Sequence, residues 1–153
     1  SRKFWSRIIR AGVGDRSTLR VMDCLFCAIV AGDVPSRQVY ADQAAVAFLD
    51  INPWKRGHTL VIPRRHVNDL LAGDEALSEI VPAINATARL LVERLGADGI
   101  NLLSNAGEVA GQEVFHLHVH LVPRYAADPG LRALPIRVPG IDLDEVAATL
   151  GPS

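Results

Sequence analysis

The chain has 153 residues, the size of one domain with room for an apolar core. Its 49% apolar and 22% charged residues are typical of a soluble globular protein. A formal net charge of −1 supplies no basic field, so we expect no nucleic-acid partner. The longest apolar stretches are far shorter than the roughly 20 residues that cross a bilayer, so we expect no membrane partner either.

The N-terminal residues 1–21 are basic, and we expect them to form a flexible extension. A secretory signal is not expected, because the segment has neither a continuous apolar core nor a small-residue cleavage site. An organelle transit peptide is the alternative, although the spacing of the residues supports it poorly. The chain's two cysteines, Cys24 and Cys27, are too close in sequence for a usual structural disulfide, which favours a reducing cytoplasm.

The segment that follows the extension predicts one short helix and then three strands. Residues 24–35 predict the helix, which Gly32 and Pro35 end. Two short strands joined by a turn are expected within residues 37–50, where β-branched and aromatic residues flank polar ones. A third strand is expected at residues 59–62, before a proline.

A long helix is predicted from Asp74 to Leu95, because apolar residues recur there at helical spacing. Asp74 is the expected N-cap, and Gly96 is expected to stop the helix at its C-terminus. Pro82 lies inside this segment, so we expect a kink or a break at that point.

Residues 100–105 predict a fourth strand, and residues 114–124 predict a fifth. The segment 126–153 is rich in proline, glycine and alanine and is expected to form a C-terminal tail. The domain proper then spans residues 22–125. Its predicted fold is α+β, with a mostly antiparallel five-stranded sheet, one long helix and a short N-terminal helix.

A run of alternating histidines within the predicted fifth strand is the most informative stretch of the sequence. Because side chains alternate between the faces of a strand, the three histidines should share one face, with apolar residues on the other. A solvated face is a poor explanation for three of the chain's five histidines, and three in line are awkward around one metal ion. A catalytic group whose neighbours fix its tautomer is the favoured interpretation. The histidines are His116, His118 and His120, and the residues between and after them are Leu117, Val119 and Leu121.

The sequence HLHVHLV resembles the His-φ-His-φ-His-φ-φ signature of the histidine-triad (HIT) superfamily, where φ is apolar. The resemblance extends to CLFCAIVAGDVPSRQVY, AFLDINPWKRGHTLVIPRRH and INLLSNAGEVAGQEVFHLHVH, and so covers about residues 22–125. It is most similar to the branch of histidine-triad nucleotide-binding proteins that hydrolyse nucleoside phosphoramidates.

This resemblance implies a role for each of three histidines. His118 would be the nucleophile that attacks the α-phosphorus and forms a nucleotidyl-imidazole intermediate. His120 would bind the phosphoryl oxygens and stabilise the charge that develops on them. His58 matches an outer histidine that assists phosphate binding or protonation of the leaving group, although a histidine beside a strand can also be only structural.

The same resemblance places a nucleoside on one side of the triad and its phosphate on the other. Asp50 would bind the ribose hydroxyls, which a carboxylate suits, although an aspartate at such a position is often a turn residue. Glu113 stands where this branch usually has serine, and a carboxylate next to a phosphate puts part of the phosphate contacts in doubt. The nucleotide-binding set is Phe26, Ile29, Phe48, Asp50 and Ile51 for the nucleoside, and Asn105, Gly111, Gln112, Glu113 and His120 for the phosphate. Taken singly, the apolar members could be simple core residues.

Cys24 and Cys27 offer two thiolates at the spacing of a metal knuckle. A redox pair and two unliganded core thiols are the alternatives, although no βαβ pattern surrounds the pair as it does in thioredoxin-like proteins. The resemblance implies a structural zinc held by these cysteines together with His66 and His116. Such a site would join the N-terminal helix to the catalytic segment.

The function implied is hydrolysis of nucleoside 5′-phosphoramidates or related nucleoside monophosphate conjugates, with a purine nucleotide or nucleoside phosphoramidate as ligand. A dinucleoside polyphosphate hydrolase or phosphorylase is an alternative that also resembles histidine-triad proteins. A nucleotide-sensing scaffold with incidental hydrolysis is a second alternative. The resemblance further implies a homodimer whose sheets join edge to edge, and an exposed sheet edge would in any case need covering.

Overall fold

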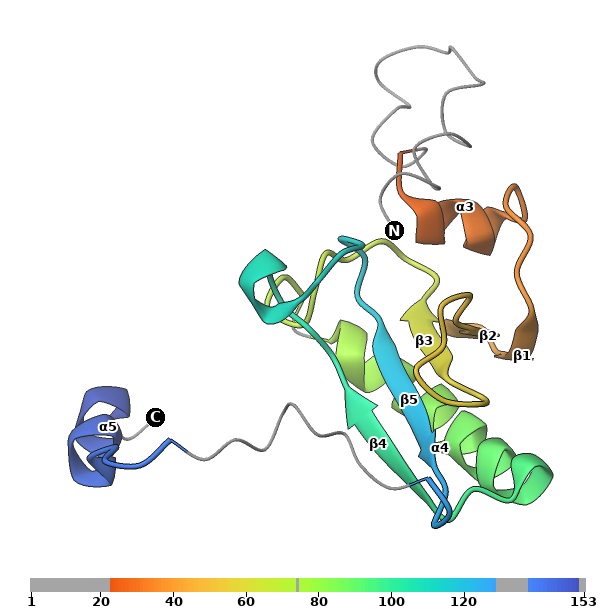
Figure 1. Cartoon of the computed structure of the whole chain (residues 1–153). Helices are drawn as coiled ribbons and strands as arrows, with labels where there is room; N and C mark the ends of the chain where they lie inside the picture. Colours follow the sequence, from red (N-terminus) through yellow and green to blue (C-terminus); the bar gives the residue numbers. More distant parts are fainter. Residues whose placement is uncertain (1–22, 74, 129–137, 152–153) are drawn as a thin grey trace.

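The computed structural model describes residues 23–73, 75–128 and 138–151, so the predicted extension at residues 1–21 lies outside the described residues. Three α-helices, one 3₁₀ helix and five strands are found in the described part of the chain (Figure 1). The helices are α3 (Leu25–Ala31), α4 (Ala76–Leu95) and α5 (Leu143–Leu150), with the short 3₁₀ helix η2 (Glu108–Ala110). The strands are β1 (Gln38–Ala41), β2 (Ala45–Leu49), β3 (Thr59–Pro63), β4 (Gly99–Leu103) and β5 (Val119–Arg124).

The strands form one sheet in the order β1-β2-β3-β5-β4, and every neighbouring pair is antiparallel. This confirms the predicted α+β class with its five-stranded antiparallel sheet. The predicted short helix, the pair of strands joined by a turn and the third strand are confirmed as α3, β1, β2 and β3. In the described part of the chain no helix combines the length and the apolar character that crossing a bilayer requires.

The two faces of the sheet are covered by different helices, because residues along β2 and β3 alternate in direction. Ala47 and Val61 point to the face covered by α4, where they join its buried residues. Phe48 and Leu60 point to the opposite face, where they pack with residues of α3. This second face carries the histidine segment, so α3 lies next to the candidate site.

Helix α4 runs for 20 residues through Pro82, so of the two outcomes expected there, a kink or a break, the break was wrong. Pro82 lies on the exposed face of the helix, while Ile80 and Ile84 on either side are buried against the sheet. One lost backbone hydrogen bond is tolerated there, because burial of the flanking residues holds the helix together. Gly96 ends the helix as predicted, with a left-handed φ of 67°. Asp74, the expected N-cap, lies outside the described residues.

Strand β5 begins at Val119, five residues later than predicted. The reason is a contact distant in sequence: the Leu117 amide donates to the Val67 carbonyl at 2.6 Å instead of joining the sheet. The Leu117 side chain packs with Val67 and Ala76. Of the three alternating histidines, only His120 therefore lies on the strand.

The predicted C-terminal tail contains helix α5, which composition did not indicate. Its N-cap, Asp142, accepts hydrogen bonds from the amides of Asp144 and Glu145 at 3.0 and 3.1 Å. An aspartate followed by acidic residues was the available signal. No residue of α5 is buried, so the helix adds nothing to the core that supports the site.

Candidate active site and metal centre

His118 lies in the segment just before β5, and hydrogen bonds on both sides fix its ring and its backbone. Its Nδ1 is 2.7 Å from the carbonyl oxygen of His116, so Nδ1 carries the proton and donates it. The Ser104 hydroxyl donates to the His118 carbonyl at 2.7 Å. Burial lowers the pKa of His118, against the opposing effect of the bond to His116. The result is a neutral imidazole whose Nε2 keeps its lone pair.

His58 and His120 form a chain of hydrogen bonds with a defined direction. The Trp54 amide donates to Nδ1 of His58 at 3.1 Å, so the proton of that ring must be on Nε2. Nε2 of His58 lies 2.9 Å from Nδ1 of His120 and donates to it. Burial lowers the pKa of His58 and that of His120, the latter to about 4, which keeps both rings neutral near pH 7. His120 is left with an Nε2–H group that can donate to a ligand.

Asp50 lies beside this chain and has one oxygen committed to a turn. Its Oδ1 accepts from the Asn52 amide at 2.8 Å, which is the turn role that the sequence left open. Its Oδ2 lies 3.8 Å from Nε2 of His58. The second oxygen therefore remains for a ligand hydroxyl.

The histidines of the candidate active site are not arranged to bind a metal, whether His58 and His120 with Asp50 or the three alternating histidines are considered. Ligand atoms of Asp50, His58 and His120 lie within 4.8 Å of one another, but Nε2 of His58 carries a proton and has no lone pair for a cation. The alternative of one ion shared by the three alternating histidines also fails, because His116 faces the two cysteines and Nδ1 of His118 faces a carbonyl.

Trp54 is a site residue that sequence reasoning missed. Its indole stacks on the His120 ring with centroids 4.9 Å apart and planes 14° apart, and it lies 4.6 Å from the His58 ring. The residue is 48% exposed, so it covers two buried histidines and also faces solvent. The available signal was an aromatic residue four positions before His58 in a loop.

Three of the four apolar residues predicted for the nucleoside lie together. Phe26, Ile29 and Phe48 are buried in one cluster between α3 and the sheet, with the two phenyl rings 5.5 Å apart. Phe26 also lies edge-on to His118, with ring centroids 5.2 Å apart, so the cluster borders the triad. Ile51 is 49% exposed and is not part of this cluster.

The segment between β4 and β5 is held by Gln112, whose side chain is buried and bonded to the protein at both ends. Its Nε2 donates to the carbonyl oxygens of Asn68 and Val114 at 2.7 and 3.2 Å, and its Oε1 accepts from the Gly107 amide at 2.8 Å. Gln112 therefore holds the segment between β4 and β5 in place through buried hydrogen bonds, and none of its side-chain atoms is directed at solvent. Of the other residues predicted for the phosphate, Asn105 and Gly111 lie side by side, and Glu113 is exposed.

The four predicted metal ligands converge. Sγ of Cys24, Sγ of Cys27, Nδ1 of His66 and Nδ1 of His116 all lie within 4.8 Å of one another. Nδ1 of His116 is 3.5 Å from each sulfur, and Nδ1 of His66 is 3.3 Å from Cys27. Zinc bonds of about 2.3 Å to sulfur and about 2.0 Å to nitrogen in a tetrahedron place neighbouring ligands about 3.6 Å apart. The spacing of these atoms fits zinc.

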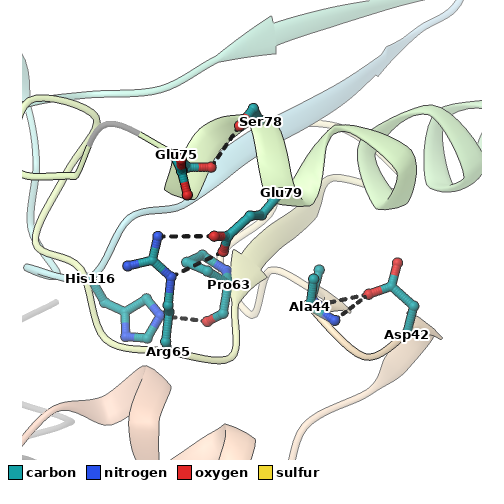
Figure 2. Close-up of polar contacts among 9 residues, drawn as sticks. Asp42, Ala44, Pro63, Arg65, Glu75, Ser78, Glu79 and His116 are labelled. Atoms are coloured by element: carbon teal, nitrogen blue, oxygen red, sulfur yellow. Dashed lines mark hydrogen bonds and ion pairs between the residues drawn. The ribbon is translucent and has the colours of Figure 1, made fainter.

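The outer nitrogen of each metal-side imidazole is also bonded as zinc ligation requires. Nε2 of His116 donates to the Pro63 carbonyl at 2.8 Å (Figure 2), and Nε2 of His66 lies 3.0 Å from Oδ1 of Asn68. Both Nδ1 atoms are thus unprotonated and face the sulfurs. Figure 2 also shows the two-pronged Arg65–Glu79 ion pair, which ties the segment after β3 to α4.

Burial raises the pKa of the Cys27 thiol to about 12, and the nearby Cys24 adds to the effect. A redox-active pair needs the opposite shift, so this microenvironment argues against that alternative. A divalent cation bound there would stabilise the thiolate form of Cys27.

Comparison with known proteins identifies the family. A family model described as the HIT domain matches residues 31–127, more than half of the chain. An uncharacterised HIT-like protein of Methanocaldococcus jannaschii is 44% identical over 125 residues, which are 80% of this chain and 95% of that protein. This chain belongs to the HIT family.

Two further HIT-family members bear on the site. A protein of Arabidopsis thaliana named adenylylsulfatase HINT3 is 36% identical over 143 residues, which cover 91% of this chain and 71% of that one. The crystal structure of a zinc-bound histidine triad family protein from Mycobacterium smegmatis matches with a TM-score of 0.68 and 43% identity, over 76% of this chain and 86% of that one. Other solved structures that match this chain are described as a hypothetical histidine triad nucleotide-binding protein from Sulfolobus tokodaii and as a HIT family hydrolase from Clostridium thermocellum.

Proposed function

We propose that this HIT-family protein hydrolyses nucleoside 5′-phosphoramidates or related nucleoside monophosphate conjugates through a nucleotidyl-histidine intermediate on His118. The observation that carries the proposal is the 2.7 Å bond from Nδ1 of His118 to the His116 carbonyl. It fixes the tautomer in which Nε2 is unprotonated and nucleophilic.

The reaction has two displacements at the α-phosphorus. Nε2 of His118 attacks phosphorus, the P–N bond to the amine breaks, and the amine leaves with that electron pair and takes a proton from solvent. Water then attacks phosphorus and gives up a proton to solvent, and the P–Nε2 bond breaks with its electron pair returning to Nε2, which gives the nucleoside monophosphate and restores neutral His118. The Nε2–H group of His120 donates to the phosphoryl oxygens, and His58 acts through His120 by holding its tautomer.

The nucleoside would lie against the cluster of Phe26, Ile29 and Phe48, with a purine base as the expected ligand. The free Oδ2 of Asp50 would accept a hydrogen bond from a ribose hydroxyl. Asn105 and Gly111, side by side in the segment before β5, would approach the phosphate. The contact of Phe26 with His118 supports the placement of the nucleoside, and the other assignments follow from the resemblance to the histidine-triad family.

Zinc fits the cluster of Cys24, Cys27, His66 and His116 and would be structural, since four protein ligands leave no open coordination position. Bound there, it would supply folding energy and fix the His116 ring. His116 in turn holds His118 through its carbonyl oxygen, so the metal would support the nucleophile without contacting the substrate.

We further propose a cytoplasmic homodimer in which β4, a strand at one edge of the sheet, contributes to the interface. Leu102 on this strand is 56% exposed, which is unfavourable for an edge left open to solvent. Light scattering at micromolar concentration should give twice the chain mass, and Leu102→Glu should shift the mass toward that of a monomer. A wild-type monomer would contradict the dimer.

Adenylyl sulfate is a second candidate substrate, because the Arabidopsis relative at 36% identity is named an adenylylsulfatase. Both candidates place a nucleoside monophosphate on His118 and differ only in the group that leaves. The site offers the same nucleophile to each.

A substrate panel separates these functions. We expect the largest kcat/KM for an adenosine 5′-phosphoramidate of a primary amine, a smaller value for adenylyl sulfate, and the smallest for a diadenosine polyphosphate. The His118→Ala variant measures the background for each compound. The phosphoramidate proposal fails if adenylyl sulfate or the polyphosphate is cleaved faster than every phosphoramidate, or if His118→Ala retains wild-type rates.

A further inference from the structure

Four aromatic rings form a row across the site. Phe26 lies 5.2 Å from His118, His118 lies 5.0 Å from His120, and Trp54 stacks on His120 at 4.9 Å, all between ring centroids. One end of the row belongs to the buried cluster next to α3. The other end is Trp54, which is 48% exposed, whereas the three other rings belong to residues 5–7% exposed.

The loop that carries Trp54 is fastened to the chain beyond β5. The Tyr125 hydroxyl donates to the Arg56 carbonyl at 2.9 Å, and the Lys55 ammonium pairs with Asp128. The backbone amide of Trp54 is itself bonded to a buried ring at 3.1 Å. The indole is therefore held over His120 by its surroundings, and one of its faces is left for other contacts.

The position of Trp54 relative to the reacting atoms indicates which part of a substrate it meets. With the nucleoside on the Phe26 side and Nε2 of His118 attacking, the bond that breaks points away from His118, as an in-line displacement requires. His120 binds the phosphoryl oxygens, and Trp54 is the ring beyond it. The group that departs is thus the part of the substrate nearest the indole.

We propose that Trp54 is a specificity-determining residue that stacks on a planar aromatic group in the leaving amine. The inference rests on the proposed phosphoramidate reaction and adds a substrate class to it. A flat, half-exposed indole favours a flat partner, and aromatic pairs gain energy beyond that of area burial. An anionic leaving group would gain less binding energy next to Trp54, because the ammonium of the adjacent Lys55 is already paired with Asp128.

The test uses two adenosine 5′-phosphoramidates, of benzylamine and of cyclohexylmethylamine, which differ in a flat versus a puckered ring of similar size. The kcat/KM of each is measured for the wild type, Trp54→Leu and Trp54→Phe. The intrinsic reactivity of each amine is the same in all three proteins, so changes in the benzyl-to-cyclohexyl ratio isolate the contact with residue 54.

We expect Trp54→Leu to lower this ratio by about two- to tenfold, and Trp54→Phe to keep most of it. Equal slowing of both substrates by Trp54→Leu would overturn the inference, since the indole would then act only by orienting His120. The proposed function would survive that result.

A binding measurement keeps the inference testable if hydrolysis fails. The Kd of each phosphoramidate is measured for His118→Ala with and without Trp54→Leu. Tighter binding of the benzyl compound that is lost with Trp54→Leu supports the stacking role. Equal Kd values for the two compounds in the presence of Trp54 overturn it. Absence of wild-type hydrolysis alone would instead count against the proposed function.

Discussion

His116 and His118 stand two residues apart, and each donates one ring N–H to a backbone carbonyl. In His116 the donor is Nε2, bonded to Pro63 at 2.8 Å, so Nδ1 is left to face the sulfurs of Cys24 and Cys27. In His118 the donor is Nδ1, at 2.7 Å from the His116 carbonyl, so Nε2 keeps its lone pair for the proposed attack on the nucleotide. In the proposed function, the ring nitrogen that bonds to the carbonyl thus decides whether the other nitrogen is available for zinc or for the substrate.

The two centres also differ in the arrangement of their groups. In the candidate metal centre four ligand atoms lie within 4.8 Å of one another and would fill a tetrahedral site, whereas the catalytic histidines are buried and the row of rings ends on an exposed indole. The link between them is the backbone carbonyl of His116. We therefore expect substitution of the proposed nucleophile His118 to remove activity with little effect on stability. Substitution of the candidate zinc ligands should mainly lower stability and leave most of the activity.

The largest expected effect is that of His118→Ala on catalysis. Loss of the nucleophile removes the covalent step, and we expect kcat to fall by roughly 10³-fold or more, with nucleotide binding within about tenfold of wild type. Zinc content and melting temperature should remain near the wild-type values. Loss of zinc in this variant would show that the two centres are not separable in this way.

The double variant Cys24→Ser/Cys27→Ser should have the largest effect on stability. We expect about one zinc per wild-type chain, none in the variant, and a melting temperature lower by about 10 °C or more. Activity per folded molecule should fall much less than in His118→Ala. Elemental analysis that finds no metal in wild-type protein never exposed to chelator would refute the zinc site.

Asp50→Ala should have an intermediate effect, confined to ribose recognition. A hydrogen bond between Oδ2 and a ribose hydroxyl is expected to contribute about 1.5–3 kcal/mol, as for other charged hydrogen bonds. The Kd of ribonucleotides should therefore rise by roughly 10- to 100-fold, with a smaller rise for 2′-deoxy analogues. Equal losses for both ligands would leave Asp50 with its turn role alone.

The smallest expected effect is on the pH dependence of stability. Burial lowers the pKa of His120 to about 4 in the folded protein, below its ordinary value of 6.5, so the unfolded chain binds more protons between these values. The free energy of unfolding that depends on a neutral His120 is therefore at its full value above pH 6.5 and decreases as the pH falls toward 4.

Replacing His120 by glutamine should reduce this acid dependence. The difference in slope between wild type and His120→Gln should be at most about 1.4 kcal/mol per pH unit, measured by urea unfolding from pH 4.5 to 7.5. The metal ligands are the same in both proteins, so their protonation cancels from the comparison. Parallel curves would show that the ring is not kept neutral by burial.

The parts of the fold predicted from sequence are those with local signals. Helix α4 ends at Gly96, as its glycine and helical spacing indicated, and β1, β2 and β3 lie where short runs between turn residues predicted strands. The start of β5 was misplaced because the bond from Leu117 to Val67 joins residues far apart in sequence. Pro82 did not break α4 because it lies on the exposed face, which spacing alone did not weigh.

Within the site, the spacing of the two cysteines and the resemblance to the histidine-triad family predicted the four metal ligands that the structure brings together. They did not predict the stacking of Trp54 on His120 or the buried bonds of Gln112. Both depend on side chains whose partners are set by tertiary packing. Ile51 was expected with the apolar cluster and is instead exposed, because resemblance assigns residues without their orientation.

The nucleophile is tested most directly by trapping the covalent intermediate. Protein mixed with an adenosine phosphoramidate and quenched within the first turnover should carry one adenylyl group, located by peptide mass spectrometry on His118 and by phosphorus NMR on its Nε2. The 2.7 Å bond that holds the proton on Nδ1 predicts this attachment. Adenylylation of His120, or of Nδ1 of His118, would contradict the account.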